Sequence, residues 1–202
     1  MKPSSESTRN RLLDAALQVV RAQGYAATTV DDLCAAAGVS KGAFFHHFRS
    51  KEDLALAAAA HWNAMTGALF AQAAYQQVVD PRERLLAYID FRAELISGTP
   101  AQYSCLLGTL AQETHEDYPA IREACGLGIT QHAQTLVATI ADAKARHAAA
   151  ADWSPESLAL YTQATLQGAF VLAKAQDSIG VAQECVRHLR RYVELLLPAA
   201  SD

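Results

Sequence analysis

The sequence predicts an all-helical protein, and three observations lead to that prediction. Glycine and proline lie almost only between segments whose apolar residues recur at helical spacing. No run of alternating β-branched residues indicates a strand. Apolar residues make up 51% of the 202 residues, which is enough for a folded core. We expect about nine helices, divided between a small three-helix N-terminal head (residues 1–50) and a helical-bundle body (residues 51–202).

The first two predicted helices are bounded by clear start and stop signals. The first covers about residues 8–23, with an apolar stripe on one face and Gly24 as its left-handed stop. Thr29 is placed to cap the second helix, and Asp32, three residues later, is placed to reach back to that cap. We expect this second helix to end at Gly38.

A third helix is predicted at 41–47, with Ser40 as its cap. It starts only about two residues after the second helix ends, which is the spacing of a helix-turn-helix motif. In that motif the N-terminal end of the second helix enters the major groove of DNA, while Phe44 and Phe48 would pack inward. Helix starts, lysine and histidine also suit phosphate and base contacts. The candidate DNA-binding residues are Thr28, Thr29, Ser40, Lys41, Gly42, Ala43, Phe45, His46, His47 and Lys51.

The remaining helices are predicted from apolar spacing, with Ser50, Asp80 and Ser154 as their clearest caps. They cover about residues 51–75, 81–96, 101–115, 119–147, 154–177 and 181–197. The last two are adjacent and amphipathic, which suits an interface in a homodimer, although packing within one chain is the alternative. The candidate interface residues are Gln163, Leu166, Gln167, Phe170, Cys185, Leu189 and Tyr192.

Charge is distributed unevenly along the chain. The whole sequence has a formal net charge of −4. Residues 1–53 hold seven Lys and Arg against six Asp and Glu, a net charge of +1, so the remainder carries −5. This asymmetry favours nucleic-acid binding by the head only weakly, because the local arrangement of positive groups matters more than their sum.

Several kinds of site are not indicated by the sequence. The four cysteines are scattered without close pairing, which argues against a zinc cluster or a disulfide framework. Adjacent His46 and His47 point to different faces of a helix and lack a third ligand, so we expect no metal and no cofactor. No nucleophile, base and orienting group occur in an interpretable arrangement, so we expect no enzyme.

No membrane contact is expected either. Residues 1–6 contain no apolar signal core, and no apolar stretch reaches the length of a membrane span without a charged or polar residue. We therefore expect a cytoplasmic protein.

One stretch resembles a known family. Residues 24–54, GYAATTVDDLCAAAGVSKGAFFHHFRSKEDL, are similar in order and spacing to the DNA-binding head of TetR family repressors. The resemblance implies a homodimer that binds double-stranded operator DNA and a body that senses a small molecule. Family members commonly have tyrosine at the position of Phe45, whose ring cannot donate a hydrogen bond to phosphate. We hypothesise that His46 compensates for that loss.

The same resemblance favours an effector site in the body. Aromatic and apolar side chains from the middle helices could line a pocket with a few polar groups, although the same composition suits an ordinary core. The candidate ligand-binding residues are Trp62, Phe70, Tyr88, Phe91, Tyr103, Cys105, Leu106, Leu110 and Tyr161.

The segment around Cys105, YSCLLG, resembles the N-ethylmaleimide-reductase repressor branch of the family, where a cysteine senses electrophiles. A buried, inert thiol is the favoured interpretation. Reactivity would require a lowered thiol pKa, and the sequence offers no obvious nearby cation beyond Arg92.

Together these features predict a one-component transcription regulator. We expect a repressor that is released from a palindromic operator when a small molecule or an electrophile tilts the fourth helix and changes the spacing of the two heads. The alternatives are an all-helical enzyme and a helical interaction protein, each with a vestigial head. The residues do not distinguish repression from activation.

Overall fold

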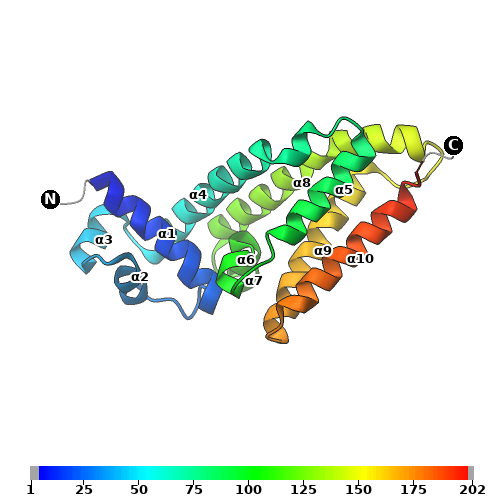
Figure 1. Cartoon of the computed structure of the whole chain (residues 1–202). Coiled ribbons are helices and arrows are strands. Elements are labelled where there is room, and N and C mark those ends of the chain that lie inside the picture. Colours follow the sequence, from blue (N-terminus) through cyan, green and yellow to red (C-terminus); the bar gives the residue numbers. More distant parts are fainter. Residues whose placement is uncertain (1–4, 200–202) are drawn as a thin grey trace. The chain divides into compact units, whose positions relative to one another are not determined.

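The computed structural model describes residues 5–199, with side chains from residue 7 onward, and every regular element in that range is helical (Figure 1). Residues 1–4, within the segment that lacks a signal core, and residues 200–202 lie outside it. The helices are α1 (Ser5–Gln23), α2 (Val30–Ala37), α3 (Lys41–His47), α4 (Lys51–Gln72), η1 (Ala74–Gln77), α5 (Pro81–Glu94), α6 (Pro100–Tyr103), α7 (Leu106–Thr114), α8 (Pro119–His147), α9 (Pro155–Ala175) and α10 (Ile179–Leu196). The predicted all-helical fold class is confirmed.

The chain packs as two compact units, and the predicted division into functional domains at residue 50 stays a prediction. The head unit consists of residues 1–67 and 104–128, and the body unit consists of residues 68–103 and 129–202. Helices α4 and α8 each contribute residues to both units.

In the head unit, α1 packs against α2, α3 and α7. The apolar stripe of α1 is buried, and the first half of α4 adds small and apolar side chains to the same core. The largest fully buried side chains of this unit are Leu12, Leu13, Leu33, Phe44, Leu54, Leu106, Leu110 and Ile121. Burial of such side chains, worth about 1.5–3 kcal/mol each, is what orders the short helices α2 and α3.

Local signals fix the ends of α2 as predicted. The Thr29 hydroxyl accepts a hydrogen bond from the Asp32 amide, and the Asp32 carboxylate accepts one from the Thr29 amide. Gly38 ends the helix with φ 62° and ψ 44°, a left-handed conformation that strains other residues. The capping box therefore fixes the start of α2, and Gly38 fixes its end, where the turn into α3 begins.

Gly24 has a φ of 89°, a left-handed conformation that favours glycine. A Cβ at this position would lie 2.3 Å from a carboxylate oxygen of Glu113. That carboxylate accepts a hydrogen bond of 2.8 Å from the Ala26 amide, so α7 closes the loop that follows α1.

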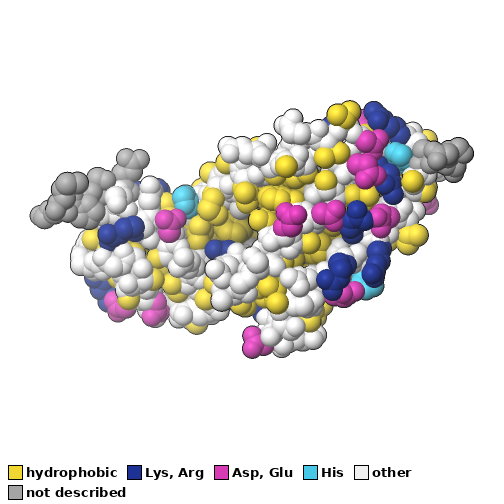
Figure 2. Space-filling model, in the orientation of Figure 1, with side chains coloured by type: hydrophobic (Ala, Val, Ile, Leu, Met, Phe, Trp, Pro, Cys, Tyr) yellow, Lys and Arg dark blue, Asp and Glu magenta, His cyan; other side chains and the backbone are white. Residues whose placement is uncertain are grey.

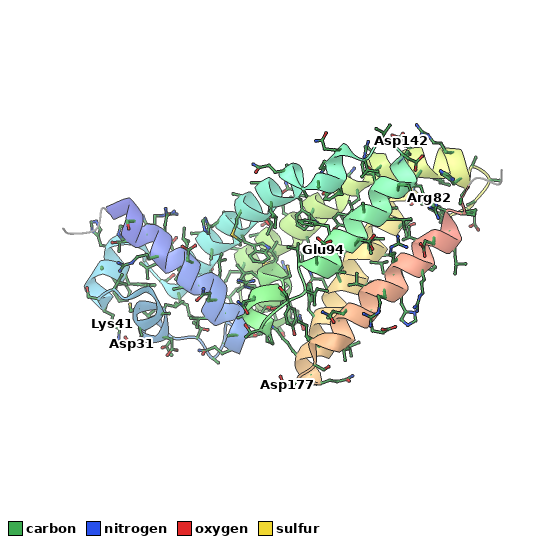
Figure 3. The ribbon with its side chains drawn as sticks, viewed as in Figure 1. Asp31, Lys41, Arg82, Glu94, Asp142 and Asp177 are labelled. Carbon is green, nitrogen blue, oxygen red and sulfur yellow. The ribbon has the colours of Figure 1, made fainter. Side chains whose placement is uncertain are left out.

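In the body unit, α10 packs along α9 and α5. Tyr88 of α5 and Leu166 of α9 are almost fully buried in this core, and Val186 of α10 packs there too. Arg82, at the start of α5, donates a hydrogen bond of 2.6 Å to the Leu197 carbonyl at the end of α10 (Figure 3). Arg190 of α10 forms an ion pair of 2.8 Å with Asp90 of α5. The three helices are thus held by an apolar core and by polar contacts along its edge.

Two predicted elements differ from the structure. The single helix expected at 101–115 is broken into α6 and α7, because Cys105 is extended, with φ −82° and ψ 126°. The Ser104 carbonyl before it accepts a hydrogen bond from Arg21 of α1. The fourth helix ends at Gln72 and not at Tyr75, and a 3-10 turn follows. Glycines 126 and 128 do not interrupt α8.

Helix α4 is, among the described residues, the one helix long and apolar enough to cross a membrane by length and composition alone. Its first half includes Leu54, Ala55, Ala58 and Ala59, all buried in the head unit. Of the 18-residue window that meets this test, 28% is buried within the chain.

Candidate nucleic-acid interface and effector region

Helix α3 has one buried and one open side. Phe44 is 0% exposed and Phe48 is 3% exposed, with ring centroids 5.9 Å apart. The Ser40 hydroxyl caps the helix by accepting from the Ala43 amide. Ser40, Lys41 and Gly42 are exposed at its N-terminal end, and Phe45 is 54% exposed. The helix therefore presents the end that would enter a DNA groove.

Lys41 is paired across the turn. Its ammonium lies 2.8 Å from a carboxylate oxygen of Asp31 on α2, and both side chains are mostly exposed (Figure 3). Hydrogen bonding and attraction by Asp31 raise the pKa of Lys41. In the free protein the positive charge of α3 is therefore partly compensated by an acid on the neighbouring helix.

At the other end of α3, His46 is exposed and His47 is half-buried. Burial, then the charges of His46 and Arg9, lower the pKa of His47. Arg9 of α1 also lies over the Phe48 ring, 5.4 Å from its centroid. Sequence reasoning did not select Arg9, since nothing local indicates that α1 packs beside the end of α3.

Thr28 and Lys51 point into the head unit. Thr28 is 1% exposed, and its hydroxyl donates to the Gly24 carbonyl. The Lys51 ammonium donates to the carbonyls of Tyr25 and Thr28, both at 2.9 Å, and lies 4.2 Å from the Tyr25 ring centroid. Burial lowers the pKa of Lys51. Both side chains thus tie the loop between α1 and α2 to the start of α4, and Thr29 serves as the cap of α2.

The candidate ligand-binding residues are distributed over both units. Trp62, Cys105, Leu106 and Leu110 belong to the head unit, whereas Phe70, Tyr88, Phe91, Tyr103 and Tyr161 belong to the body unit. Within the body unit, Phe70 contacts Tyr88 and Phe91. Tyr103 instead packs on Phe170, and Tyr161 is 47% exposed against Tyr192. The structure therefore gathers three of the five body residues into one cluster.

In the head unit, the cation beside Cys105 is Arg21, not the Arg92 expected from the sequence. Arg21 is 8% exposed, and its guanidinium lies 4.8 Å from the Trp62 ring centroid. Burial lowers the pKa of Arg21, and the nearby Cys105 thiol acts in the opposite direction. Cys105 itself is partly exposed, whereas Cys125 is fully buried and burial raises its pKa to about 12. Arg21 is 84 positions before Cys105, so no local signal could have paired them.

A buried polar chain runs through the aromatic cluster of the body unit. Tyr88 Oη lies 3.0 Å from His132 Nε2, and Gln163 donates to the Tyr88 oxygen at 3.3 Å. Burial, and then the charge of Arg92, lower the pKa of His132 to about 4. A pKa this low keeps the ring neutral at pH 7. Because the Arg92 guanidinium, which can only donate, also lies 3.4 Å from Nε2, we assign Nε2 as the acceptor and the Tyr88 hydroxyl as its donor.

The candidate interface residues fall into two groups. Gln163, Leu166, Phe170 and Leu189 are each at most 5% exposed within one protomer, so their side chains form its own core. Tyr192 is 41% exposed, and Gln167 and Cys185 are partly exposed. On α10 the buried stripe is Ala182, Val186, Leu189 and Val193, so of the three α10 candidates only Leu189 belongs to it.

A short turn that leads into a helix with an open N-terminal end and a buried aromatic anchor defines the helix-turn-helix class of DNA-binding proteins. Comparison with known proteins gives the family. Residues 12–58 match the family described as bacterial regulatory proteins, tetR family. Residues 81–189, more than half of the chain, match the tetracyclin repressor-like C-terminal domain. The chain belongs to the TetR family of DNA-binding transcriptional regulators, as predicted.

Two relatives match along most of the chain. The transcriptional regulator AcuR of Cereibacter sphaeroides is 29% identical over 175 residues, which are 86% of this chain and 80% of that protein. The transcriptional repressor DhaR of Mycobacterium sp. is 26% identical over 194 residues, which are 96% and 94% of the two chains. The identity with the regulator CymR of Pseudomonas putida is 50%, but it covers 25% of each chain.

Solved structures show the same fold. A TetR transcriptional regulator from Chloroflexus aurantiacus is 27% identical with a TM-score of 0.80, covering 94% of this chain and 95% of the other. Escherichia coli NemR in its reduced form is 24% identical with a TM-score of 0.80, covering 96% and 99%. At that identity the likeness to NemR shows the fold alone, so membership of the electrophile-sensing branch stays a prediction.

The packing of Lys51 predicts a loss of stability when it is replaced. We expect Lys51→Met to lower the free energy of unfolding by about 1–3 kcal/mol, because two carbonyls lose a charged donor. Chemical denaturation followed by circular dichroism measures the effect. Lys41→Met, at an exposed position, is the control and should change stability by less than about 0.5 kcal/mol. Equal stability of Lys51→Met and the unmodified protein would contradict the structural role.

The buried imidazole of His132 predicts a pH dependence of stability. Its pKa is about 4 when folded, against about 6.5 in an unfolded chain. Above pH 6.5 both states are neutral and no stability is lost. As the pH falls from 6.5 to 4, the unfolded state takes up the proton first, so folding loses at most about 3 kcal/mol.

We expect His132→Gln to lack this component, so that its stability relative to the unmodified protein rises as the pH falls through that window. Arg92 and Tyr88 are the charged and titratable groups that contact His132, and they remain in the variant. Urea denaturation at pH 7, 6, 5 and 4 measures the difference. His188→Gln, on the exposed side of α10, should follow the unmodified protein. A parallel course of His132→Gln would show that the pKa of His132 is the same in the folded and unfolded states, and would contradict the lowered pKa.

Proposed function

We propose that the protein is a dimeric repressor in the cytoplasm that binds a palindromic operator through two copies of α3 and leaves it when an effector binds the body. The observation that carries this proposal is the open N-terminal end of α3, with Ser40, Lys41 and Gly42 exposed above the buried Phe44. Small residues there let the backbone approach the duplex closely. We retain Thr29, Ser40, Lys41, Gly42, Ala43, Phe45, His46 and His47 as proposed contacts and give Thr28 and Lys51 a structural role.

The proposed interface is the exposed apolar face of α9. Leu160, Tyr161, Val171 and Leu172 are each 43–56% exposed, and Leu195 on α10 is 81% exposed. Gly168 lies in the same stripe, and a Cβ there would meet open space. Such a stripe on a soluble protein suits a self-complementary contact, in which α9 and α10 of two copies form a four-helix bundle.

The charges on α10 are paired with one another within one chain. Figure 2 shows positively charged side chains, which on α10 are arginines, interspersed with Asp and Glu. Arg187 and Arg191 both face Glu184, and Arg190 faces Glu194. Because these charges are compensated within one chain, the apolar stripe is the part of the surface left to a second copy.

Two links inside the head unit support a route for the effector signal. Arg21 of α1 donates to the Ser104 carbonyl at the start of α7, and Glu113 of α7 accepts from the Ala26 amide. A shift of α7 and the residues just before it would therefore move α1, which packs against α2 and α3. The effector must bind the released arrangement better than the DNA-bound one. A small molecule and an electrophile at Cys105 are both compatible with this route.

The contact of α3 with DNA predicts a change in salt dependence. In fluorescence anisotropy titrations with duplex DNA, Lys41→Gln should weaken binding and make the slope of log K against log salt shallower by about 1 per head. Asp31→Asn should tighten binding severalfold, because it removes an acid from beside the phosphates. Lys174→Gln on α9, which removes the same charge from the other compact unit, is the control. Unchanged binding by both head variants would reject the proposed role of α3.

The dimer proposal predicts dissociation when the α9 stripe is charged. We expect Tyr161→Glu combined with Leu172→Glu to elute at the mass of one chain in size-exclusion chromatography with light scattering, whereas the unmodified protein elutes at the mass of two. The exposed Gln77→Glu is the control and should stay dimeric. A dimeric double variant with native helix content would place the interface elsewhere.

A further inference from the structure

Arg92 of α5 is a charged side chain inside the aromatic cluster of the body unit. Its guanidinium lies 5.2 Å from the Phe70 ring centroid, and one nitrogen is 3.4 Å from His132 Nε2. Arg92 is half-buried, as are Phe91 beside it and His132. The cation is therefore partly removed from water while still accessible.

The polar groups next to Arg92 do little to balance its positive charge. His132 Nε2 already accepts from Tyr88 at 3.0 Å, and the Tyr88 oxygen in turn accepts from Gln163. Gln163, Tyr88 and His132 are thus joined by two hydrogen bonds in which Arg92 takes no part. The guanidinium has five N–H donors. Among these three residues its one acceptor is the neutral His132 Nε2, which also accepts from Tyr88.

No described carboxylate forms an ion pair with Arg92. Of the other body-unit arginines, Arg84 also has no ion pair but donates to backbone carbonyls, whereas the remaining five are paired with carboxylates. Asp90, two residues earlier, is paired with Arg190 at 2.8 Å. Glu94, two residues later, is exposed on α5 (Figure 3). A half-buried guanidinium that faces aromatic rings and a neutral imidazole gains from an added anion, and its planar fork fits a carboxylate through two parallel hydrogen bonds.

The surroundings of Arg92 also define the rest of the ligand. The rings of Phe70, Tyr75, Tyr88 and Phe91 contact one another with centroids 5.4–5.8 Å apart. Such rings favour an apolar, preferably flat, group next to the charge. The cluster thus combines a site for one negative group with an apolar wall.

We propose that the effector of the body unit is a small monocarboxylate with an apolar body, whose carboxylate pairs with Arg92 and whose apolar part packs against Phe70 and Phe91. This inference rests on the proposed function, since it names the chemical class of that effector. Binding would supply the negative charge that the described cluster lacks. Arg92 would then act as the residue that selects acids over neutral analogues of the same shape.

Matched acids and amides test the proposal on the full-length protein. The probes are benzoate against benzamide, and propionate against propionamide, each titrated at pH 7.5 with the melting temperature and isothermal titration calorimetry as readouts. We expect at least one acid to bind and raise the melting temperature, with its amide at least tenfold weaker. Equal effects of acid and amide, or no binding by either acid, would overturn the proposal.

Variants at Arg92 identify the site. Arg92→Gln should weaken binding of the acid at least tenfold, and Arg92→Lys, which keeps the charge without the fork, should weaken it less. Arg146→Gln is the control, because its side chain is 60% exposed and pairs with Asp80. If circular dichroism shows that Arg92→Gln does not fold, Arg92→Lys is used in its place. Acid binding by the folded Arg92 variant that equals that of the unmodified protein would overturn the proposal.

Operator binding is measured separately, so that failure of the effector proposal can be distinguished from failure of the proposed regulator function. Anisotropy with a labelled palindromic duplex should show DNA release by the acid and not by its amide. DNA binding without any acid binding would reject this inference and leave the regulator function intact. Acid binding that depends on Arg92 without any DNA binding would support the site and contradict the proposed function.

Discussion

Burial of Phe44 is the constraint on which the rest of the head depends. A seven-residue helix is not stable alone in water, so α3 exists because Phe44 and Phe48 are packed into the core formed by α1, α2 and α4. The same packing fixes which end of α3 faces outward. With Phe44 inward and Ser40 capping the first turn, the residues exposed at the N-terminal end of α3 are Ser40, Lys41 and Gly42. The orientation of α3 toward DNA is thus a consequence of the packing of Phe44 in the core.

The fold could be predicted from the sequence where signals are local. The Thr29 and Asp32 capping box, the left-handed Gly38 and the Ser40 cap each act within a few residues, and all three are present as expected. The break between α6 and α7 could not be predicted, because it coincides with a hydrogen bond from Arg21 to Ser104, 83 positions apart. Which candidates on α10 are buried has a similar cause, since α5 and α9 together determine which stripe of α10 is covered.

The candidate sites, like the fold, could be predicted where the signals are local and not where they depend on long-range contacts. Exposure at the start of α3 follows from its helical period, so Ser40, Lys41 and Gly42 were found. The orientation of Lys51 is decided by carbonyls more than 20 positions earlier, which the sequence does not bring near. The polar groups of the body unit were largely missed for the same reason. Arg92 and His132 are 40 positions apart, and only the packing of α5 against α8 makes them neighbours.

Selection of bound sequences from random duplex DNA tests the central claim, that two copies of α3 read DNA with their N-terminal ends. The account predicts enrichment of one palindrome whose half-sites are about 34–36 Å apart, and a changed sequence preference when Gly42 is replaced by alanine. Enrichment of no sequence, or of a site without twofold symmetry, would contradict it.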